Sequence, residues 1–195
     1  MKIGVISDIH ENFHNLILAM QKMKEEGVEQ IICLGDLMND GIAKVLSISE
    51  TPVHMIWGNN DGDKVMLTRT AFQKGSQLTI SNNTYDFLEF DGKKIFVTHY
   101  EDLAQPMSAS GNFDVVFFGH THISKVEQHG RCTIVNPGEI SAQRTGQATL
   151  AIYDTRGKSV NIVTLEGTIT LKSELVDKFL KENREKLGFR PGTLS

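Results

Sequence analysis

Aspartate, histidine and asparagine side chains follow five apolar, strand-like segments of this chain. Each segment and the polar residues that follow it are these: 3–7 precedes Asp8 and His10, 31–34 precedes Asp36, 53–57 precedes Asn59, 95–98 precedes His99, and 115–118 precedes His120 and His122. The carboxyl ends of parallel strands meet at one edge of a sheet, where ligand sites form. Taken singly, such a residue is usually a cap, a turn or a solvated side chain. Because seven arrive together, the sequence predicts one metal site that holds two ions.

Spacing and residue type narrow the choice of metal. Asp8 and His10 are two residues apart, so in an extended segment their side chains point the same way and can approach one ion. His120 and His122 have the same spacing and can serve one ion each. The ligands are imidazole, carboxylate and amide without thiolate, which suits Mn, Fe, Co, Ni or Zn better than Ca or a structural Zn. Two divalent ions with Asp8 and Asp36 leave a net positive charge, which favours an anion or a metal-bound hydroxide.

Hydrophobic periodicity places these residues on alternating strands and helices in the first half of the chain. Apolar residues recur every three or four positions from residue 13 to 23, which predicts a helix that Asn12 caps and Gly27 ends. The dipeptide Asp91–Gly92 predicts a hairpin. Further helices are predicted at 41–50 and 61–74, and strands at 2–7, 30–34, 52–57, 84–90, 93–98 and 113–118.

The second half is predicted to be mostly β-structure. Asn136–Pro137–Gly138 predicts a turn in which glycine supplies a positive φ. Short strands are predicted at 123–128, 131–135, 147–153, 159–165 and 167–171. The segment 173–187 predicts a helix with apolar Leu175, Val176, Phe179, Leu180 and Leu187. We expect two packed sheets with helices outside, as a single domain at 1–172 followed by a C-terminal helix and tail at 173–195.

Composition excludes several classes of protein. Of the 195 residues, 39% are hydrophobic and 23% charged, as in ordinary globular domains. A net charge of −4 gives no electrostatic footprint for duplex nucleic acid. The chain enters a strand at residue 2, which leaves no room for a signal peptide, and no apolar run approaches the ~20 residues that span a membrane. Cys33 and Cys132 lack CxxC spacing, so we expect no disulfide framework and a cytoplasmic location.

Five ordered blocks resemble the signature of the calcineurin-like metallophosphoesterases, most closely that of the small YfcE-type phosphodiesterases of bacteria and archaea. The blocks are DIH at 8–10, GDLMNDG at 35–41, GNND at 58–61, TH at 98–99 and GHTH at 119–122. The turn at 136–138 extends the likeness to about residue 140. The resemblance implies an α+β chain with a four-layer αββα sandwich, the metallo-dependent phosphatase fold, in which two mixed β-sheets are flanked by helices.

The resemblance also implies how the ligands are shared and what the site does. One ion takes Asp8, His10, Asp36 and His122, and the other takes Asp36, Asn59, His99 and His120, so that Asp36 bridges. The implied activity is hydrolysis of small-molecule phosphodiesters, or of phosphomonoesters, by attack of a metal-bridging hydroxide. Manganese is the ion expected most, with Fe, Ni, Co or Zn as alternatives.

Three positions depart from the family pattern. Asn60 stands where many relatives carry a catalytic His with an acid beside it, here Asp61; Asn has no titratable proton and can only donate hydrogen bonds to a phosphate. Tyr100 follows His99 where glycine is common, and either narrows the pocket, stacks on substrate or anchors the loop. Glu139 replaces a common serine after the turn; because a carboxylate repels phosphate, we expect it to point away or to contact another part of the substrate.

Several assignments stay open at this point. The residues expected to act in catalysis are Asp36, Asn59, Asn60, Asp61, His99 and His120, and those expected to bind substrate are Asn60, Tyr100 and Arg144. Arg144 can clamp a phosphate, although an exposed surface arginine is the commoner case. The alternative function is a non-catalytic protein-interaction scaffold that retains the fold. A nuclease would share the chemistry, but the chain lacks a basic stripe. The C-terminal helix either packs on its own domain or mediates self-association of the chain into a homo-oligomer.

Overall fold

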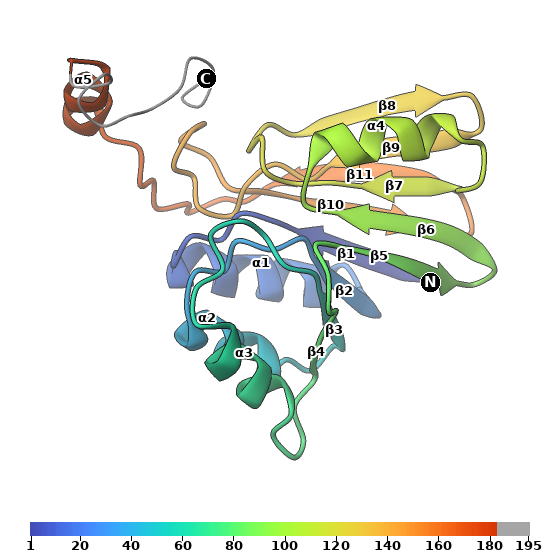
Figure 1. Cartoon of the computed structure of the whole chain (residues 1–195), viewed down its shortest axis with the longest axis horizontal. Helices are drawn as coiled ribbons and strands as arrows, with labels where there is room; N and C mark the ends of the chain where they lie inside the picture. Colours follow the sequence, from blue (N-terminus) through green and yellow to red (C-terminus); the bar gives the residue numbers. More distant parts are fainter. Residues whose placement is uncertain (183–195) are drawn as a thin grey trace.

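Two β-sheets pack face to face, with helices on both outer sides (Figure 1). The structure is a computed structural model that describes residues 1–182, apart from the side chains of residues 176, 177 and 180. The first sheet contains β1 (Lys2–Ile6), β2 (Gln30–Cys33), β3 (Val53–Met55), β4 (Leu78–Ile80), β10 (Thr149–Asp154) and β11 (Ser159–Thr164). The second contains β5 (Tyr85–Phe90), β6 (Lys93–Thr98), β7 (Val115–Phe117), β8 (Lys125–His129) and β9 (Cys132–Asn136). The helices are α1 (Phe13–Glu25), α2 (Asp40–Ser47), α3 (Lys64–Ala71), α4 (Glu101–Ala109) and α5 (Glu174–Glu182).

Both sheets are mixed. The first has the order β11-β10-β1-β2-β3-β4, in which β1 to β4 run parallel and β10 and β11 are antiparallel to their neighbours. The second has the order β5-β6-β7-β9-β8, with a parallel centre and antiparallel edges. The chain therefore has two mixed sheets between helical layers, as the resemblance implied.

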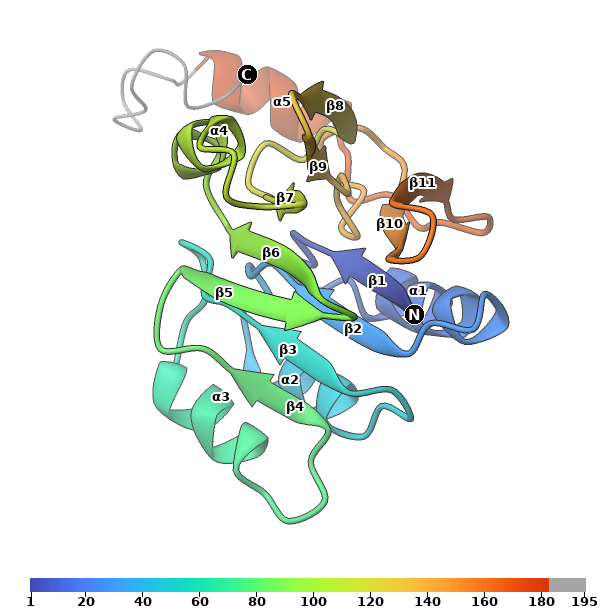
Figure 2. The same cartoon turned by 90° about the vertical axis from the view of Figure 1, so that its right-hand side faces the viewer.

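Three apolar layers hold the sandwich together. The alternation along β1 sends Ile3 and Val5 between the sheets and Ile6 towards the helices. On β6, Val97 points between the sheets, whereas Phe96 lies under α4. Figure 2 shows α4 on the opposite side of the sandwich from α1 and α2. Each such side chain, when fully buried, stabilises the fold by about 1.5–3 kcal/mol, so the strands that carry the candidate ligands are anchored on both faces.

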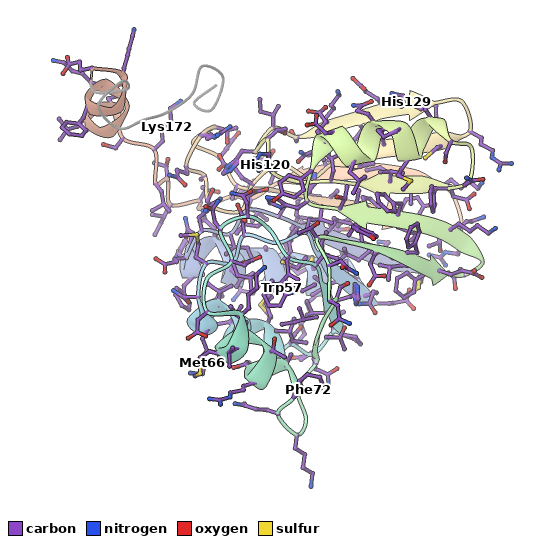
Figure 3. All side chains as sticks on the ribbon, viewed as in Figure 1. Trp57, Met66, Phe72, His120, His129 and Lys172 are labelled. Carbon is purple, nitrogen blue, oxygen red and sulfur yellow. The ribbon has the colours of Figure 1, made fainter. Side chains whose placement is uncertain are left out.

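The sheets bring the predicted loops to one end of the sandwich. The parallel strands β1, β2 and β3 end beside β6 and β7, so the loops that follow them meet. Figure 3 labels His120 in this region, at the same end of the molecule as Lys172. The predicted hairpin is confirmed, with Asp91 and Gly92 at φ 49° and 68°, and so is the positive φ of Gly138, at 84°.

Some elements differ from the sequence-based expectation. The strand β4 and the helix α4 were not predicted; α4 contains Pro106, and no side chain caps its start. The predicted helix at 61–74 begins only at Lys64, because Asp63 is its cap. The strand predicted at 167–171 is absent from the described chain, because Asn15 binds both the N–H and the carbonyl of Ile169 and takes the place of a neighbouring strand.

The predicted C-terminal helix is present from Glu174 and is described as far as Glu182. It lies beyond the end of the sandwich in Figure 1. Its predicted continuation to residue 187 falls outside the described residues, as do the side chains of Val176 and Leu180. Self-association through this helix and a domain division at residue 172 stay predictions. Among residues 1–182, no helix has both the length and the apolar character needed to cross a membrane.

Candidate metal centre

Most of the candidate ligands sit in loops with an uncommon backbone conformation. Asp8, His10, Asp36, His120 and His122 have φ of 53°, 42°, 57°, 67° and 66°. This left-handed region costs about 1–2 kcal/mol for a residue with a side chain, so the surroundings must hold it in place. The positive φ therefore turns each side chain sharply away from the direction its strand would have given it.

Asp61 fastens the loop after β2 to the loop after β3. Its carboxylate, which is buried, accepts hydrogen bonds from the amides of Leu37 and Gly58 at 2.7 Å each, of Asp36 at 3.1 Å and of Met38 at 3.4 Å. Both oxygens are therefore occupied by backbone donors. This placement is that of a residue that positions the two loops, and the catalytic role expected from the sequence stays a prediction.

His122 and Asp8 present two electron-pair donors to each other. Nδ1 of His122 lies 2.7 Å from Glu139 Oε2, so in the neutral ring the proton is on Nδ1 and the lone pair is on Nε2. That Nε2 lies 3.3 Å from Asp8 Oδ1, and His10 Nε2 lies 3.7 Å from the same oxygen. Within the described residues, the buried atoms Asp8 Oδ1 and His10 Nε2 have no hydrogen-bond partner. A shared cation fits this arrangement, since two ligands ~2.1 Å from an ion at right angles lie ~3 Å apart.

The same arrangement recurs at His99. Nδ1 of this buried ring lies 2.7 Å from the carbonyl of Leu34, which can only accept, so the neutral ring has its lone pair on Nε2. Nε2 lies 3.0 Å from Oδ1 of Asn59, a second acceptor. Asp36 Oδ2 lies 3.6 Å from His99 Nε2 and 3.6 Å from His10 Nε2. Asp36 therefore stands between two sets of donors, as a bridging carboxylate would.

Charge reinforces this arrangement. Burial alone would raise the pKa of Asp8, but His10, His122 and His99 lower it to about 2. Burial would lower the pKa of His10, but the charges of Asp8 and Asp36 outweigh burial and raise it. Because the pKa of His10 is raised, an ion at this ligand competes with a proton more strongly than at an ordinary histidine.

His120, Tyr100 and Arg144 form the exposed side of the centre. The amide of His120 donates to Asp8 Oδ2 at 3.0 Å, and its ring lies 5.1 Å from that of His99 and 5.3 Å from that of Tyr100. Burial lowers the pKa of His120, as do the charges of His99 and Arg144. Arg144 is exposed, and its charge lies close enough to His120 to lower the pKa of that ring.

Asn60 is directed at Asp36. Its amide N–H donates to Oδ1 of Asp36 and its side-chain Nδ2 to Oδ2, both at 2.8 Å. Asn60, which stands where many members of the resembled family carry histidine, thus holds the carboxylate of Asp36 in this structure. It has no proton to give at neutral pH.

The structure brings five of the seven predicted ligands into two overlapping groups, while Asn59 contacts His99 and the ring of His120 lies beside that of His99. Two groups have ligand atoms within 4.8 Å of one another, namely Asp8 with His10 and His122, and Asp8 with Asp36 and His99. The sequence analysis missed the support that Glu139 gives to His122. The only signal for it was a carboxylate directly after the NPG turn, for which the sequence predicted either an orientation away from the phosphate or a contact with another part of the substrate.

Comparison with known families identifies this arrangement. Residues 1–158 match the family described as the calcineurin-like phosphoesterase superfamily domain. The chain belongs to the calcineurin-like phosphoesterase superfamily. The superfamily consists of hydrolases that act on phosphoric esters, and membership implies divalent metal ions, for which the donors above are suited.

Individual relatives agree with this membership. Phosphodiesterase MJ0936 of Methanocaldococcus jannaschii is 32% identical over 170 residues, which cover 85% of this calcineurin-like phosphoesterase and 100% of the relative. Phosphodiesterase YfcE of Escherichia coli is 24% identical over 152 residues, 75% of this chain and 83% of the relative. A solved archaeal phosphodiesterase superposes with a TM-score of 0.75 at 30% identity, covering 85% and 100%. Vps29 of Chaetomium thermophilum, at 14% identity and a TM-score of 0.59 over 84% and 95%, shares the fold.

Proposed function

We propose that this chain is a two-metal phosphodiesterase that hydrolyses small phosphate esters. The observation that carries the proposal is the pair of opposed electron-pair donors, His122 with Asp8 and His99 with Asn59, on either side of Asp36. Such opposed acceptors repel each other unless cations lie between them. The complete ligand set disfavours the scaffold alternative, which has no use for it.

The residues of the chain divide between the two ions as follows. One ion would be held by Asp8, His10, Asp36 and His122, and the other by Asp36, Asn59, His99 and His120. When bound, the ions would activate water as the nucleophile and neutralise charge on the phosphoryl oxygens. Manganese is the ion we propose first, because imidazole and carboxylate together suit a borderline transition metal.

Residues on the exposed side would orient the ester. The charge of Arg144 acts on His120, and a guanidinium beside this ligand can bind two phosphoryl oxygens at once. The ring of Tyr100 stands edge-on to His99 and His120 and forms one wall for the substrate. Asn60 holds Asp36 and supplies no proton, so the leaving group departs without a side-chain acid at this position. We therefore expect substrates with good leaving groups to react fastest.

The proposed preference for diesters rests on two of the relatives described above, MJ0936 and YfcE, which are named phosphodiesterases. A test compares hydrolysis of bis-p-nitrophenyl phosphate and p-nitrophenyl phosphate with Mn²⁺ and with chelator, for wild type and Asp36→Ala. We expect Mn²⁺-dependent hydrolysis, faster for the diester, that Asp36→Ala abolishes and the exposed-site control Glu89→Ala leaves unchanged. Bound Mn²⁺ with no hydrolysis of either ester would refute the proposed function.

A further inference from the structure

Glu139 is a buried carboxylate whose two oxygens serve different parts of the centre. Oε2 accepts from His122 Nδ1 at 2.7 Å, from Ser141 Oγ at 2.5 Å and from the amide of Gln143 at 3.0 Å. Oε1 accepts from the amide of Arg144 at 3.0 Å, and from the amide and the hydroxyl of Thr145 at 2.7 Å and 2.8 Å. The side chain is buried, and both of its oxygens are occupied by protein donors.

The backbone around Glu139 is fixed on both sides. Before it, the side-chain Nδ2 of Asn136 donates to the carbonyl of Gly119 and to Thr121 Oγ1, which ties the turn to the loop that carries His120 and His122. After it, the amide of Ser141 donates to the carbonyl of Asp8 at 2.9 Å. The carboxylate therefore has a fixed position relative to the candidate ligands, and it can impose that position on whatever it binds.

Each oxygen has a distinct consequence. Oε2 keeps the proton of His122 on Nδ1, so that Nε2 presents its lone pair towards Asp8. Oε1 gathers the amides of residues 144 and 145 into a tight turn, in which Ala142 takes a positive φ of 52°. This turn carries Arg144, whose charge acts on His120. We propose that Glu139 is a positioning residue that couples the metal ligand His122 to the phosphate-binding turn of Arg144.

This inference rests on the two-ion centre proposed above, and it explains why glutamate stands at residue 139. A serine has one oxygen and cannot bind His122 and the turn together. A glutamine has two terminal groups, but one of them is an NH₂ group, which donates. In either orientation of the amide, this NH₂ group faces other donors. Facing His122, it favours the tautomer with the proton on Nε2, which cannot bind an ion. Facing residues 144 and 145, it opposes two amides and loosens the turn.

Calorimetry on chelator-treated protein tests the two contacts of Glu139 separately and without relying on turnover. The Oε2 arm is its bond to His122, and the Oε1 arm is its bonds to residues 144 and 145. The first titration uses MnCl₂, and the second adds inorganic phosphate to Mn²⁺-saturated protein. For Glu139→Gln we expect the Kd of one of the two Mn²⁺ ions to rise ~10–100-fold, which is the usual effect of removing a group that supports a metal ligand, and phosphate to bind more weakly. For Arg144→Ala we expect weaker phosphate binding with unchanged Mn²⁺ affinity. The control Glu89→Gln should change neither Kd.

Two results would overturn the inference. Wild-type Mn²⁺ and phosphate affinities in Glu139→Gln, with only a lower unfolding temperature, would make Glu139 a purely structural residue. An equal rise in the Kd of both ions would point to general loosening. If Glu139→Gln does not fold, Thr145→Val removes one donor of the Oε1 arm, and unchanged phosphate affinity in that variant refutes the coupling. Wild-type protein that binds two ions but hydrolyses no ester would refute the phosphodiesterase and leave this test intact.

Discussion

Replacing Asp61 tests whether this residue positions the centre or takes part in the chemistry. The carboxylate accepts from four backbone amides, and the two shortest bonds, to Leu37 and Gly58, are 2.7 Å long. Hydrogen bonds to a charged group contribute about 1.5–3 kcal/mol each. Counting the two short bonds, we expect Asp61→Ala to lower the free energy of unfolding by about 4 kcal/mol. In a chain of this length that corresponds to roughly 8–16 °C in Tm.

The matched pair Asp61→Asn and Asp63→Asn makes the test specific. Asp61→Asn keeps one acceptor oxygen, and we expect a loss of about 2 kcal/mol. Asp63 caps α3 by accepting from the amide of Met66 at 3.1 Å, and asparagine caps equally well, so Asp63→Asn should change stability by less than about 0.5 kcal/mol. The measurement is urea unfolding followed by circular dichroism, with chelator present. Equal stability of the two asparagine variants would refute the positioning role, because a group needed only for chemistry has no effect on metal-free unfolding.

Three further predictions concern the same centre. In Gly58→Ala the new Cβ would overlap Asp36 Oδ1, and such overpacking costs about 1–3 kcal/mol. Because Asp36 would have to move, we expect kcat to fall at least ~10-fold in steady-state kinetics, with Tm measured alongside to report the cost in stability. Glu139 has its pKa lowered from 4.5 to about 2, so its stabilisation is present above pH 4.5 and is lost as the pH falls towards 2. In metal-free protein the free energy of unfolding should therefore fall by on the order of 3 kcal/mol between pH 4.5 and 2 because of this group. If the free energy of unfolding of Glu139→Gln changed with pH in parallel with that of wild type, the prediction would be contradicted. Tyr100→Phe keeps the ring beside His120 and should leave KM within ~2-fold of wild type, whereas Tyr100→Ala should raise KM. Equal KM values for the two variants would show that the ring does not contact the substrate.

The main layers of the fold were predictable because their signals are local and strong. The strand ends that carry the ligands combine β-branched runs with glycine or polar residues, and the helix after Asn12 has a clear apolar face. In contrast, α4 has Pro106 in its interior and no side-chain cap at its start, so the acidic residues of its first turn, Glu101 and Asp102, are the main signal for it and were not recognised. The segment 167–171 alternates like a strand, but its backbone is bound by side chains such as Asn15, which are 154 residues away in sequence. Such long-range pairing is absent from local patterns.

The candidate site was predictable in its residue types and less so in their roles. Opposite charges and donor atoms at strand ends were sufficient to group the seven ligands. The roles of Asp61 and Glu139 depend on which atoms face each carboxylate. Asp61 faces four amides, and Glu139 faces His122 and the amides of residues 144 and 145. For Glu139 the sequence predicted only that the carboxylate points away from a phosphate or contacts another part of the substrate, because a sequence does not reveal which donors surround a buried side chain.

The left-handed backbone at five candidate ligands has a consequence for how this protein evolves. Glycine adopts a φ near +60° at no steric cost, yet these positions carry Asp or His. Each therefore lowers stability by about 1–2 kcal/mol relative to a relaxed residue, and selection for function must offset that loss. Directed evolution of this chain for thermal stability in the presence of chelator should therefore replace these positions first, with glycine at His120 as the simplest case. The same selection with Mn²⁺ present should leave them intact, so a screen for heat resistance would itself map the residues that hold the ions.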